Sequence, residues 1–454
     1  MFAGLDYGTS HCAIGVHTTT GVQLVPLDGD TPFMQSNILI AARELLVQAV
    51  ADLIQDPNQQ SKFCRARARD LQRAQRIKNE LGLTATDAFW STGQAATKLH
   101  LQDPLEGWFA KSPKSFLGAS GISDAQRTFL TDIVTVMLLH MKQRLEQHQQ
   151  TKVEQVVIGR PINFQGINAE SSNAQAVSIL QTAAELAGFK DIAFFYEPIG
   201  AGLDFETQLC TDQKVLVVDA GGGTTDCSLI QMGPSHRNQI DRSADFLGHS
   251  GMRIGGNDLD IRLIFHHYMN YFGKNSQLKD GLPVPVHLFG IASQVNNIPA
   301  QAEFYSAASN TKMQFLTANI QDTQSLKRFE TIRENLLTYR LWQSAEQCKL
   351  ALSNGNLHHN DLGYIETGLS TELNANEYEQ LVAPEVQRIE RTILEPIRQS
   401  ATKPDMIYLT GGTSKLSLLR TTVQVRFPDT PIVEGDHFGS VTAGLTKIAK
   451  RVFG

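Results

Sequence analysis

The chain of 454 residues is long enough to form roughly two to four compact units with a sizeable hydrophobic core. Its net charge is −6, and because no basic stripe is present, nucleic acid is not expected as a partner. The five cysteines form no CxxC pair, which indicates reduced thiols and a cytoplasmic location. Since the sequence shows no signal peptide and no apolar run of ~20 residues, no membrane partner is expected.

The first half of the chain alternates strand-like and helix-like segments. Short apolar runs bounded by Gly, Pro and Asp predict strands over residues 1–5, 13–17, 22–27, 37–41, 153–158 and 193–196. Longer stretches predict helices over residues 43–80, 124–149 and 173–188. The regularly spaced basic residues of the first helix indicate a solvated face rather than an anion site.

The second half repeats this plan. Strands are expected over residues 215–219, 227–232 and 406–410, the first two forming a hairpin. Helices are expected over residues 259–271, 325–354 (with a break), 376–400 and 442–453. Residues 272–300, rich in Gly, Pro, Asn and Gln, are expected to form a loop. Alternating strands and helices indicate the α/β class, and a β-hairpin in each half suggests two similar lobes.

Two short segments, far apart in the chain, have similar sequence patterns. Residues 4–10 and 216–225 each contain an apolar run ending in an aspartate, Asp6 or Asp219, followed by a glycine-containing turn and hydroxyl residues. Each predicts a strand, a tight turn and a returning strand, and two such hairpins could face one another across a cleft. Glycines let backbone N–H groups approach phosphate oxygens, and two aspartates can hold a hydrated Mg²⁺.

The two phosphate-binding patterns most common in α/β proteins are missing. The sequence contains no GxxxxGK[ST] motif and no GxGxxG motif that opens a helix after a strand. A lone Gly-Gly-Gly is usually just a flexible turn, but the whole string from Asp219 to Asp226 between two apolar runs is far more specific. Nucleotide binding must therefore rest on the paired hairpins.

Together with further segments, these hairpins resemble the nucleotide-binding domain of the heat-shock-70 (DnaK) chaperones, within the actin/hexokinase ATPase superfamily. The best-matching segments are residues 4–10, 108–120, 157–166, 196–204, 217–228, 247–260, 407–413 and 438–445. More narrowly, the chain is similar to the bacterial YegD-type heat-shock-70-like proteins.

The resemblance implies an α/β fold of the actin-like ATPase (ribonuclease H-like) type. Two lobes, each with a mixed β-sheet flanked by helices, would enclose a cleft. Lobe I would span residues 1–210 and lobe II residues 211–454. Enlarged peripheral insertions are expected at about 42–107 in lobe I and about 232–340 in lobe II.

The resemblance also implies roles toward ATP or ADP and Mg²⁺. Asp6 and Asp219 would hold the Mg²⁺ through water, Lys114 would reach the γ-phosphate and the attacking water, and Glu197 would lie near the water shell. The implied catalytic residues are Lys114, Glu197, Asp219, Thr224 and Asp6. The implied nucleotide-binding residues are Gly8, Thr9, Ser10, Gly221, Gly222, Gly223, Asp226, Gly255, Gly256, Asp258, Glu346, Lys349, Gly411, Gly412, Thr413, Lys415 and Asp436.

Three of these residues also suit structural roles. A lone lysine such as Lys114 is normally exposed, but its Pro-Lys-Ser-Phe-Leu-Gly setting favours the phosphate role. Glu197 could instead bond a loop amide at a strand end, and Asp226 could cap a turn.

The chain departs from the heat-shock-70 pattern in three ways, of which one is the stretched spacing at the insertions of about 42–107 and 232–340. Beyond residue 445 we expect a terminal helix and no peptide-binding domain. Leu350 and Lys415 stand where the family places arginines against the adenine base, and arginine and lysine are not equivalent at a stacking site. Weaker or altered base recognition is therefore expected.

Three functions remain as hypotheses. The first is Mg-ATP binding with slow hydrolysis, in which the lobes report the nucleotide state to an unknown protein partner or client. The second is a nucleotide-sensing scaffold with negligible hydrolysis. The third and least favoured is a small-molecule (sugar) kinase, because no acidic residue lies in a sugar-binding motif that would supply the base.

Overall fold

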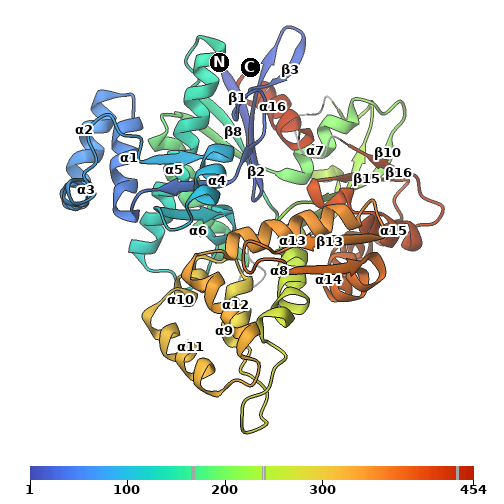
Figure 1. The fold of residues 1–454 in the computed structure, drawn as a ribbon. Helices are drawn as coiled ribbons and strands as arrows, with labels where there is room; N and C mark the ends of the chain where they lie inside the picture. The colour runs from blue at the N-terminus through green and yellow to red at the C-terminus, as the bar shows by residue number, and fades with distance from the viewer. Residues whose placement is uncertain (165–168, 238, 240–241, 436–438) are drawn as a thin grey trace.

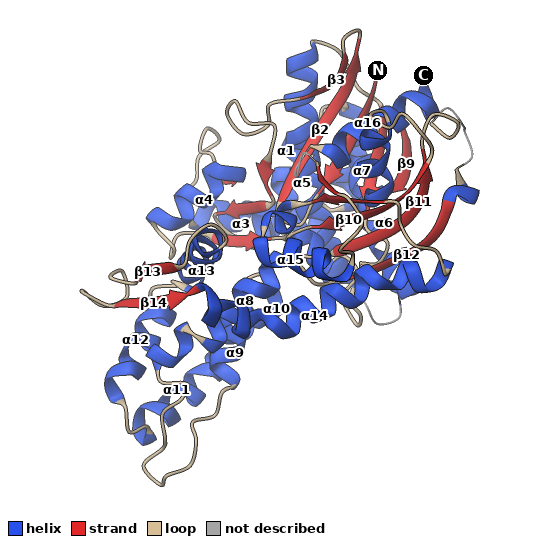
Figure 2. Cartoon of the chain, turned by 90° about the vertical axis from the view of Figure 1, so that its right-hand side faces the viewer, coloured by secondary structure: helices blue, strands red, loops and turns tan. Residues whose placement is uncertain are grey.

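The computed structural model describes residues 1–164, 169–237, 239, 242–435 and 439–454. Two larger β-sheets are flanked by helices, two small sheets of two and three strands lie at the periphery of the described chain, and a group of helices extends away from the larger sheets (Figures 1 and 2). In the described ranges, no helix is both long and apolar enough to cross a membrane.

The first sheet gathers strands from the first 200 residues. In the described residues it has six strands in the order β3-β2-β1-β8-β9, with β4 paired to β2. These are β1 (Phe2–Tyr7), β2 (His11–Thr18), β3 (Gly21–Leu24), β4 (Met34–Gln35), β8 (Gln155–Arg160) and β9 (Asp191–Tyr196). The hairpin β1–β2 is antiparallel, whereas β1, β8 and β9 run parallel.

The second sheet has the same plan. Its five described strands lie in the order β12-β11-β10-β15-β16. They are β10 (Gln213–Ala220), β11 (Thr225–Met232), β12 (Phe246–Met252), β15 (Met406–Thr410) and β16 (Ile432–Glu434). Here too the hairpin β10–β11 is antiparallel, whereas β10, β15 and β16 run parallel. The two sheets therefore place β1 and β10, which carry the two aspartates, at equivalent positions.

Helices cover the faces of both sheets. Apolar side chains of α1, α5 and α6 share a core with the first sheet. Those of α14 and α15 pack on the second sheet. Helices α7 and α16 pack their apolar side chains between β8 of the first sheet and β10 of the second. The bounds are α1 (Leu46–Leu53), α5 (Asp124–Gln149), α6 (Ala169–Leu186), α7 (Glu197–Glu206), α14 (Ala375–Ser400), α15 (Ser417–Arg426) and α16 (Ser440–Phe453).

Two peripheral groups complete the fold. Beside the first sheet lie α2 (Pro57–Ala66), α3 (Ala68–Glu80), α4 (Gly93–Gln102), β5 (Asn37–Ile40), β6 (Trp90–Thr92) and β7 (Trp108–Lys111). The group away from the sheets has its own core. It comprises α8 (Gly256–His266), α9 (His287–Ser293), α10 (Ile298–Phe304), α11 (Ala307–Asn319), α12 (Thr323–Glu334), α13 (Thr338–Leu352), β13 (Leu357–Asp361) and β14 (Ser370–Asn374). Short 3₁₀ turns are Arg43–Leu45, Pro113–Phe116, Ser243–Asp245, Tyr268–Phe272 and Gly412–Lys415.

The α/β class and the actin-like architecture expected from the sequence are confirmed, but two local predictions are wrong. The single helix expected over residues 43–80 is divided, because Asp56 caps a new helix that begins at Pro57. The loop expected over residues 272–300 contains α9 and the start of α10. Asn297 caps α10 by accepting a hydrogen bond from the Ala300 N–H, and Pro299 suits a first turn, so a start signal was present in the sequence.

Helices α7 and α16 pack unusually closely because both carry a glycine at their contact. A Cβ on Gly444 would lie 1.7 Å from the Gly200 carbonyl oxygen, and a Cβ on Gly200 would lie 3.0 Å from the Val441 carbonyl oxygen. Since the two helices lie between β8 and β10, this contact fixes how the two sheets sit against each other.

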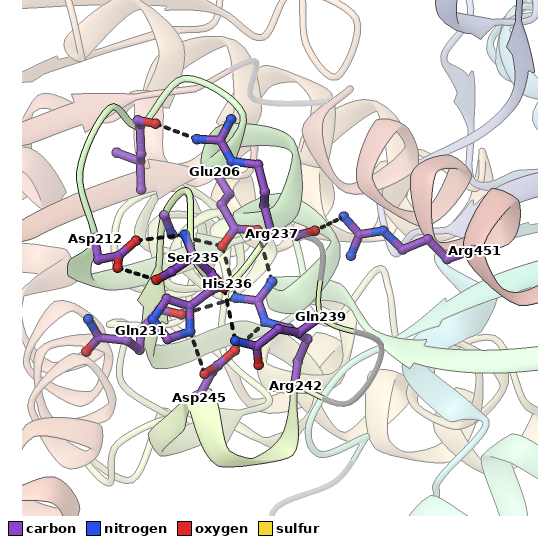
Figure 3. A network of polar contacts seen from close by, with 12 residues as sticks. Glu206, Asp212, Gln231, Ser235, His236, Arg237, Gln239, Arg242, Asp245 and Arg451 are labelled. Atoms are coloured by element: carbon purple, nitrogen blue, oxygen red, sulfur yellow. Dashed lines mark hydrogen bonds and ion pairs between the residues drawn. The ribbon is translucent and has the colours of Figure 1, made fainter.

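An ion-pair network fastens the end of α7 to the connection between β11 and β12 (Figure 3). Glu206, only 1% exposed, accepts two hydrogen bonds of 3.0 Å from the guanidinium of Arg242, which also contacts Asp245. From α16, Arg451 donates a 2.6 Å hydrogen bond to the backbone carbonyl of Arg237. The network therefore ties α7, this connection and α16 together.

We expect Gly444→Ala to destabilise the protein by roughly 1–3 kcal/mol or more, because the added methyl forces α7 and α16 apart. Gly290→Ala is the matched control, since a Cβ there would meet only a Phe265 ring carbon at 3.8 Å, and alanine favours a helix interior by ~0.5–1 kcal/mol. Thermal unfolding of both variants checks this. Equal midpoints would contradict the packing argument.

Candidate functional site

The turn between β1 and β2 forms the first loop of the site. Asp6 pairs with Ala13 near the end of the hairpin, and the turn passes through Gly8, Thr9 and Ser10. A Cβ on Gly8 would lie 2.1 Å from the His11 carbonyl oxygen, so this position requires glycine. Asp6 is thereby placed directly beside a tight turn.

The turn between β10 and β11 forms the second loop. Asp219 and Asp226 face each other in the ladder, and the N–H of Gly221 donates to the carbonyl of Thr224 at 2.9 Å, closing the turn. Asp226 accepts a 2.8 Å hydrogen bond from the N–H of Ile162. Asp6 and Asp219 thus hold equivalent positions in two sheets of the same plan, as the paired sequence segments predict.

The two loops touch each other. A Cβ on Gly222 would lie 1.8 Å from the Ser10 hydroxyl oxygen, and a Cβ on Gly223 would lie 2.6 Å from the Thr9 methyl carbon. Both positions therefore require glycine, because only a residue without a side chain lets the loops approach this closely. The prediction that the hairpins face one another is confirmed by this geometry.

Lys114 and Glu197 meet beside these loops. Lys114 lies in the short turn Pro113–Phe116, which follows Ser112 in a left-handed conformation (φ 55°). Glu197 is the first residue of α7. The Lys114 ammonium donates to the Glu197 carboxylate at 2.5 Å, and the two side chains are 4% and 7% exposed. Lys114 is thus buried and paired, rather than a solvent-exposed lysine.

The site holds more negative charge than one lysine can neutralise. Burial and the nearby Glu197 raise the pKa of Asp6 and of Asp219 to about 8, and the pKa of Asp226 to about 7. Burial lowers the pKa of Lys114, but Glu197 and Asp6 outweigh this effect and raise it. Among the described residues, Asp6 Oδ1 is buried without a hydrogen-bond partner. These features suit a site that receives a cation.

The start of α8 adjoins the second loop. The N–H of Gly256 donates to the Gly221 carbonyl at 3.1 Å, and the N–H of Asn257 donates to the Gly222 carbonyl at 2.8 Å. Asp258 caps the helix by accepting a 2.8 Å hydrogen bond from the N–H of Gly255. This helix therefore extends the glycine loop toward α13.

The predicted residues surround one cavity of about 350 Å³. Those that line it are Asp6, Gly8, Thr9, Ser10, Lys114, Glu197, Asp219, Gly221, Gly222, Thr224, Gly256, Glu346, Lys349, Gly411, Gly412 and Thr413. Positions more than 400 residues apart in the chain are thus brought together around the same space.

Some predicted site residues do not line the cavity. Gly223 packs on Thr9, Asp226 bonds the Ile162 N–H, and Gly255 and Asp258 form the cap of α8. Lys415 is exposed and is not part of the lining. Asp436 lies outside the described residues.

Sequence reasoning missed part of the cavity wall. Phe33 and Leu416 line the cavity but lie in no motif that could have pointed to them, whereas Val441 lies in the matching segment 438–445 and was given no role. The buried Asp260, on α8, binds Lys349; a signal for it existed, because it lies two residues beyond the Gly-Gly-Asn-Asp stretch.

The chain shares sequence with heat-shock-70 proteins. The family model described as "Hsp70 protein" matches residues 117–286. The chain is 23% identical over 468 residues to "Heat shock 70 kDa protein 13" of Bos taurus, covering 97% of this chain and 86% of that protein. It is 24% identical over 309 residues to "Chaperone protein dnaK3" of Synechocystis sp., covering 66% of this chain and 32% of that protein.

This chain is similar to Hsp70 proteins over most of its length. The matched segment, residues 117–286, contains Glu197, the whole second loop and the start of α8. A second relative, "Heat shock 70 kDa protein 13" of Pongo abelii, is 22% identical over 97% of the chain. The narrower likeness to YegD-type proteins and the division into lobes at residue 210 stay predictions.

We expect the isolated chain to be more stable at about pH 6 than at about pH 9. The pKa of an aspartate in an unfolded chain is ~3.9, whereas the pKa of Asp6 and of Asp219 in the folded chain is about 8. The folded state binds more protons over this window, so the free energy of unfolding falls as the pH rises through about 8. Thermal unfolding without divalent cations measures this.

Asp219→Asn should flatten this pH dependence, because the amide does not titrate. A midpoint that rises from about pH 6 to about pH 9 in the unaltered protein would contradict the charge assignment.

Proposed function

We propose that this protein binds Mg-ATP and hydrolyses it slowly, using the cavity between the two glycine loops. The observation that carries the proposal is the Lys114–Glu197 pair, buried beside two loops that each supply an aspartate and turn glycines. Hydrolysis of a phosphoanhydride needs neutralised phosphate charge and a positioned water molecule, and these residue types match both needs.

The glycine loops support a phosphate-binding role. Thr9, Ser10 and Thr224 bring hydroxyl donors to the cavity wall, and the turn glycines bring backbone N–H groups. Phosphate groups of ATP or ADP would lie between the two loops. The Hsp70-like relatives support nucleotide as the ligand.

The carboxylates support a hydrated Mg²⁺. Asp6 and Asp219 would hold the ion through its water shell, as Mg²⁺ prefers. The unpartnered Asp6 oxygen and the raised pKa of both aspartates fit this role. Bound Mg²⁺ would neutralise phosphate charge.

Lys114 and Glu197 would act on the reacting groups. The Lys114 ammonium stabilises the negative charge on the terminal phosphate oxygens, and the Glu197 carboxylate accepts a hydrogen bond from the attacking water. Their 2.5 Å contact holds both groups in place before the nucleotide arrives. Residues 1–210 and 211–454 would act as two lobes that report the bound nucleotide to a protein partner or client.

A nucleotide-sensing scaffold is the second candidate. Leu350 at the cavity wall is 51% exposed, and Lys415 does not line the cavity. Neither residue supplies an arginine to stack on a base. Calorimetry that finds Mg-ATP binding without phosphate release would favour this candidate, whereas multiple turnovers would exclude it.

We expect Lys114→Ala and Asp219→Asn each to lower the rate of phosphate release from Mg-ATP by ~10²–10³-fold, because each removes a charge directed at the phosphates. Lys142→Ala is the matched control. Lys142 pairs with Glu146 at 3.0 Å, with side chains 12% and 13% exposed, outside the cavity. A phosphate-release assay checks this, and unchanged turnover in both site variants would overturn the site assignment.

A further inference from the structure

Helices α2 and α3 concentrate positive charge at the outer edge of the molecule, beside α1 (Figure 1). Residues 62–78 contain seven lysine and arginine residues and one acidic residue, Asp70, so this segment has a net charge of +6. Since the whole chain has a net charge of −6, the rest of it carries −12. The segment is therefore a local exception in an acidic protein.

Packing fixes which side chains of α3 face the solvent. Ala74 is buried in the core that α1 shares with the first sheet, and Leu71 and Ile77 pack against that core. Just before α3, Arg67 donates hydrogen bonds of 3.0 and 2.8 Å to Asp132 on α5, which is 3% exposed. These contacts turn another face of α3 to the solvent. That face carries an arginine row, on successive helical turns, formed by Arg69, Arg73 and Arg76.

The arginine row is poorly neutralised within the chain. Arg73 pairs with Glu44 at 2.8 Å, but the two side chains are 65% and 31% exposed, and such exposed pairs contribute little stability. Asp70 is already paired with Arg67 at 2.6 Å. Among the described residues, the side chains of Arg69 and Arg76 have no hydrogen bond or ion pair. Two of the three guanidinium groups are thus free to bind a ligand.

Repulsion within the arginine row works against its own helix, because like charges three or four residues apart on a helix destabilise it. Helix α14 shows the alternative arrangement. Its arginines are interspersed with glutamates, as in Glu390, Arg391, Glu395 and Arg398, and Arg398 lies 3.7 Å from Glu395. Between Arg69 and Arg76, by contrast, the only acidic residue is Asp70. An unrelieved row of this kind suits a partner that supplies the negative charge.

The chemistry of the arginine row indicates what that partner presents. A guanidinium group donates two parallel hydrogen bonds to one carboxylate, which a lysine ammonium does not do. The row extends over ~10 Å, since a helix rises ~1.5 Å per residue, and this is the length of about three residues of an extended chain. A long polyanion such as a nucleic acid would reach past the row and meet the rest of the chain, which carries −12. A short acidic segment avoids that repulsion.

We propose that the arginine row is a docking surface for an acidic segment of a partner protein, in which several Asp or Glu residues follow one another. The carboxylates of that segment would bind the guanidinium groups of Arg69 and Arg76 and compete with Glu44 for Arg73. The inference does not depend on the proposed nucleotide binding, because the row lies outside the cavity.

Fluorescence anisotropy on the full chain tests this, with a rhodamine-labelled peptide of six glutamates as the probe. The unaltered protein should bind the peptide with a dissociation constant below ~1 mM, and added salt should weaken the binding. The triple variant Arg69→Gln, Arg73→Gln and Arg76→Gln should weaken it by about 10-fold or more, because charge-assisted hydrogen bonds are lost.

The matched control removes the same charge from another helix. Arg388, Arg391 and Arg398 are exposed arginines of α14. The triple variant Arg388→Gln, Arg391→Gln and Arg398→Gln changes the net charge equally, so it should alter the affinity for the peptide by less than about 3-fold. Equal weakening by both triple variants would show only a general effect of net charge and would overturn the inference.

Thermal unfolding separates docking from a structural role. The variant of the arginine row should unfold at the same temperature as the unaltered protein or at a higher one, because glutamine removes the repulsion along α3. A clearly lower midpoint would identify the row as part of the fold and overturn the inference.

Two further results would also overturn it. One is the absence of peptide binding by the unaltered protein at low salt. The other is tighter binding of a labelled RNA of twelve nucleotides than of the peptide, since the occupant would then be a nucleic acid. Failure of Mg-ATP binding would leave this inference untouched, and failure of peptide binding would leave the proposed function untouched.

Discussion

The close approach of the two glycine loops is the contact on which the rest of the site depends. Because Gly222 and Gly223 have no side chains, they reach Ser10 and Thr9 from the opposite sheet. The aspartates of β1 and β10 then share one cavity. The packing of α7 on α16, also through glycines, holds the two sheets in the relative position that this contact needs.

Bringing the loops together places several carboxyl groups close to one another, and this changes their pKa values. Burial and the presence of Glu197 raise the pKa of both Asp6 and Asp219 to about 8, so the ligand-free site is strained electrostatically. One buried lysine, Lys114, offsets part of that charge. This group of buried carboxylates is the physical reason to propose a hydrated metal ion together with a polyanion such as a nucleotide.

Helix α13 connects the cavity to a contact between the two peripheral groups. Near its start, Tyr339 packs against Phe109 of β7 with ring centroids 4.7 Å apart, and the ring of Trp342 lies under the ammonium of Lys111. Glu346 and Lys349, one and two turns after Trp342, line the cavity. The same helix thus carries both a contact between the two peripheral groups and two polar side chains that line the cavity.

The sequence by itself determined the local parts of this protein. The Asp-Gly-hydroxyl pattern of residues 4–10 and 216–225 was sufficient to predict two hairpins, because turn geometry depends on neighbouring residues. A helix over residues 124–149 followed from its periodicity. The family resemblance then placed Lys114 and Glu197 near the phosphate loops, although nothing local to either residue predicts their 2.5 Å contact.

Only the tertiary structure decided the rest. It brought Phe33 and Leu416 to the cavity wall and set Asp260 behind Lys349, 89 positions away in the chain. It also moved Lys415 out of the lining and turned the expected loop over residues 272–300 partly into helix. Such contacts depend on how helices and sheets pack over long distances in sequence, whereas a turn or a strand is fixed by the chemistry of a few adjacent residues.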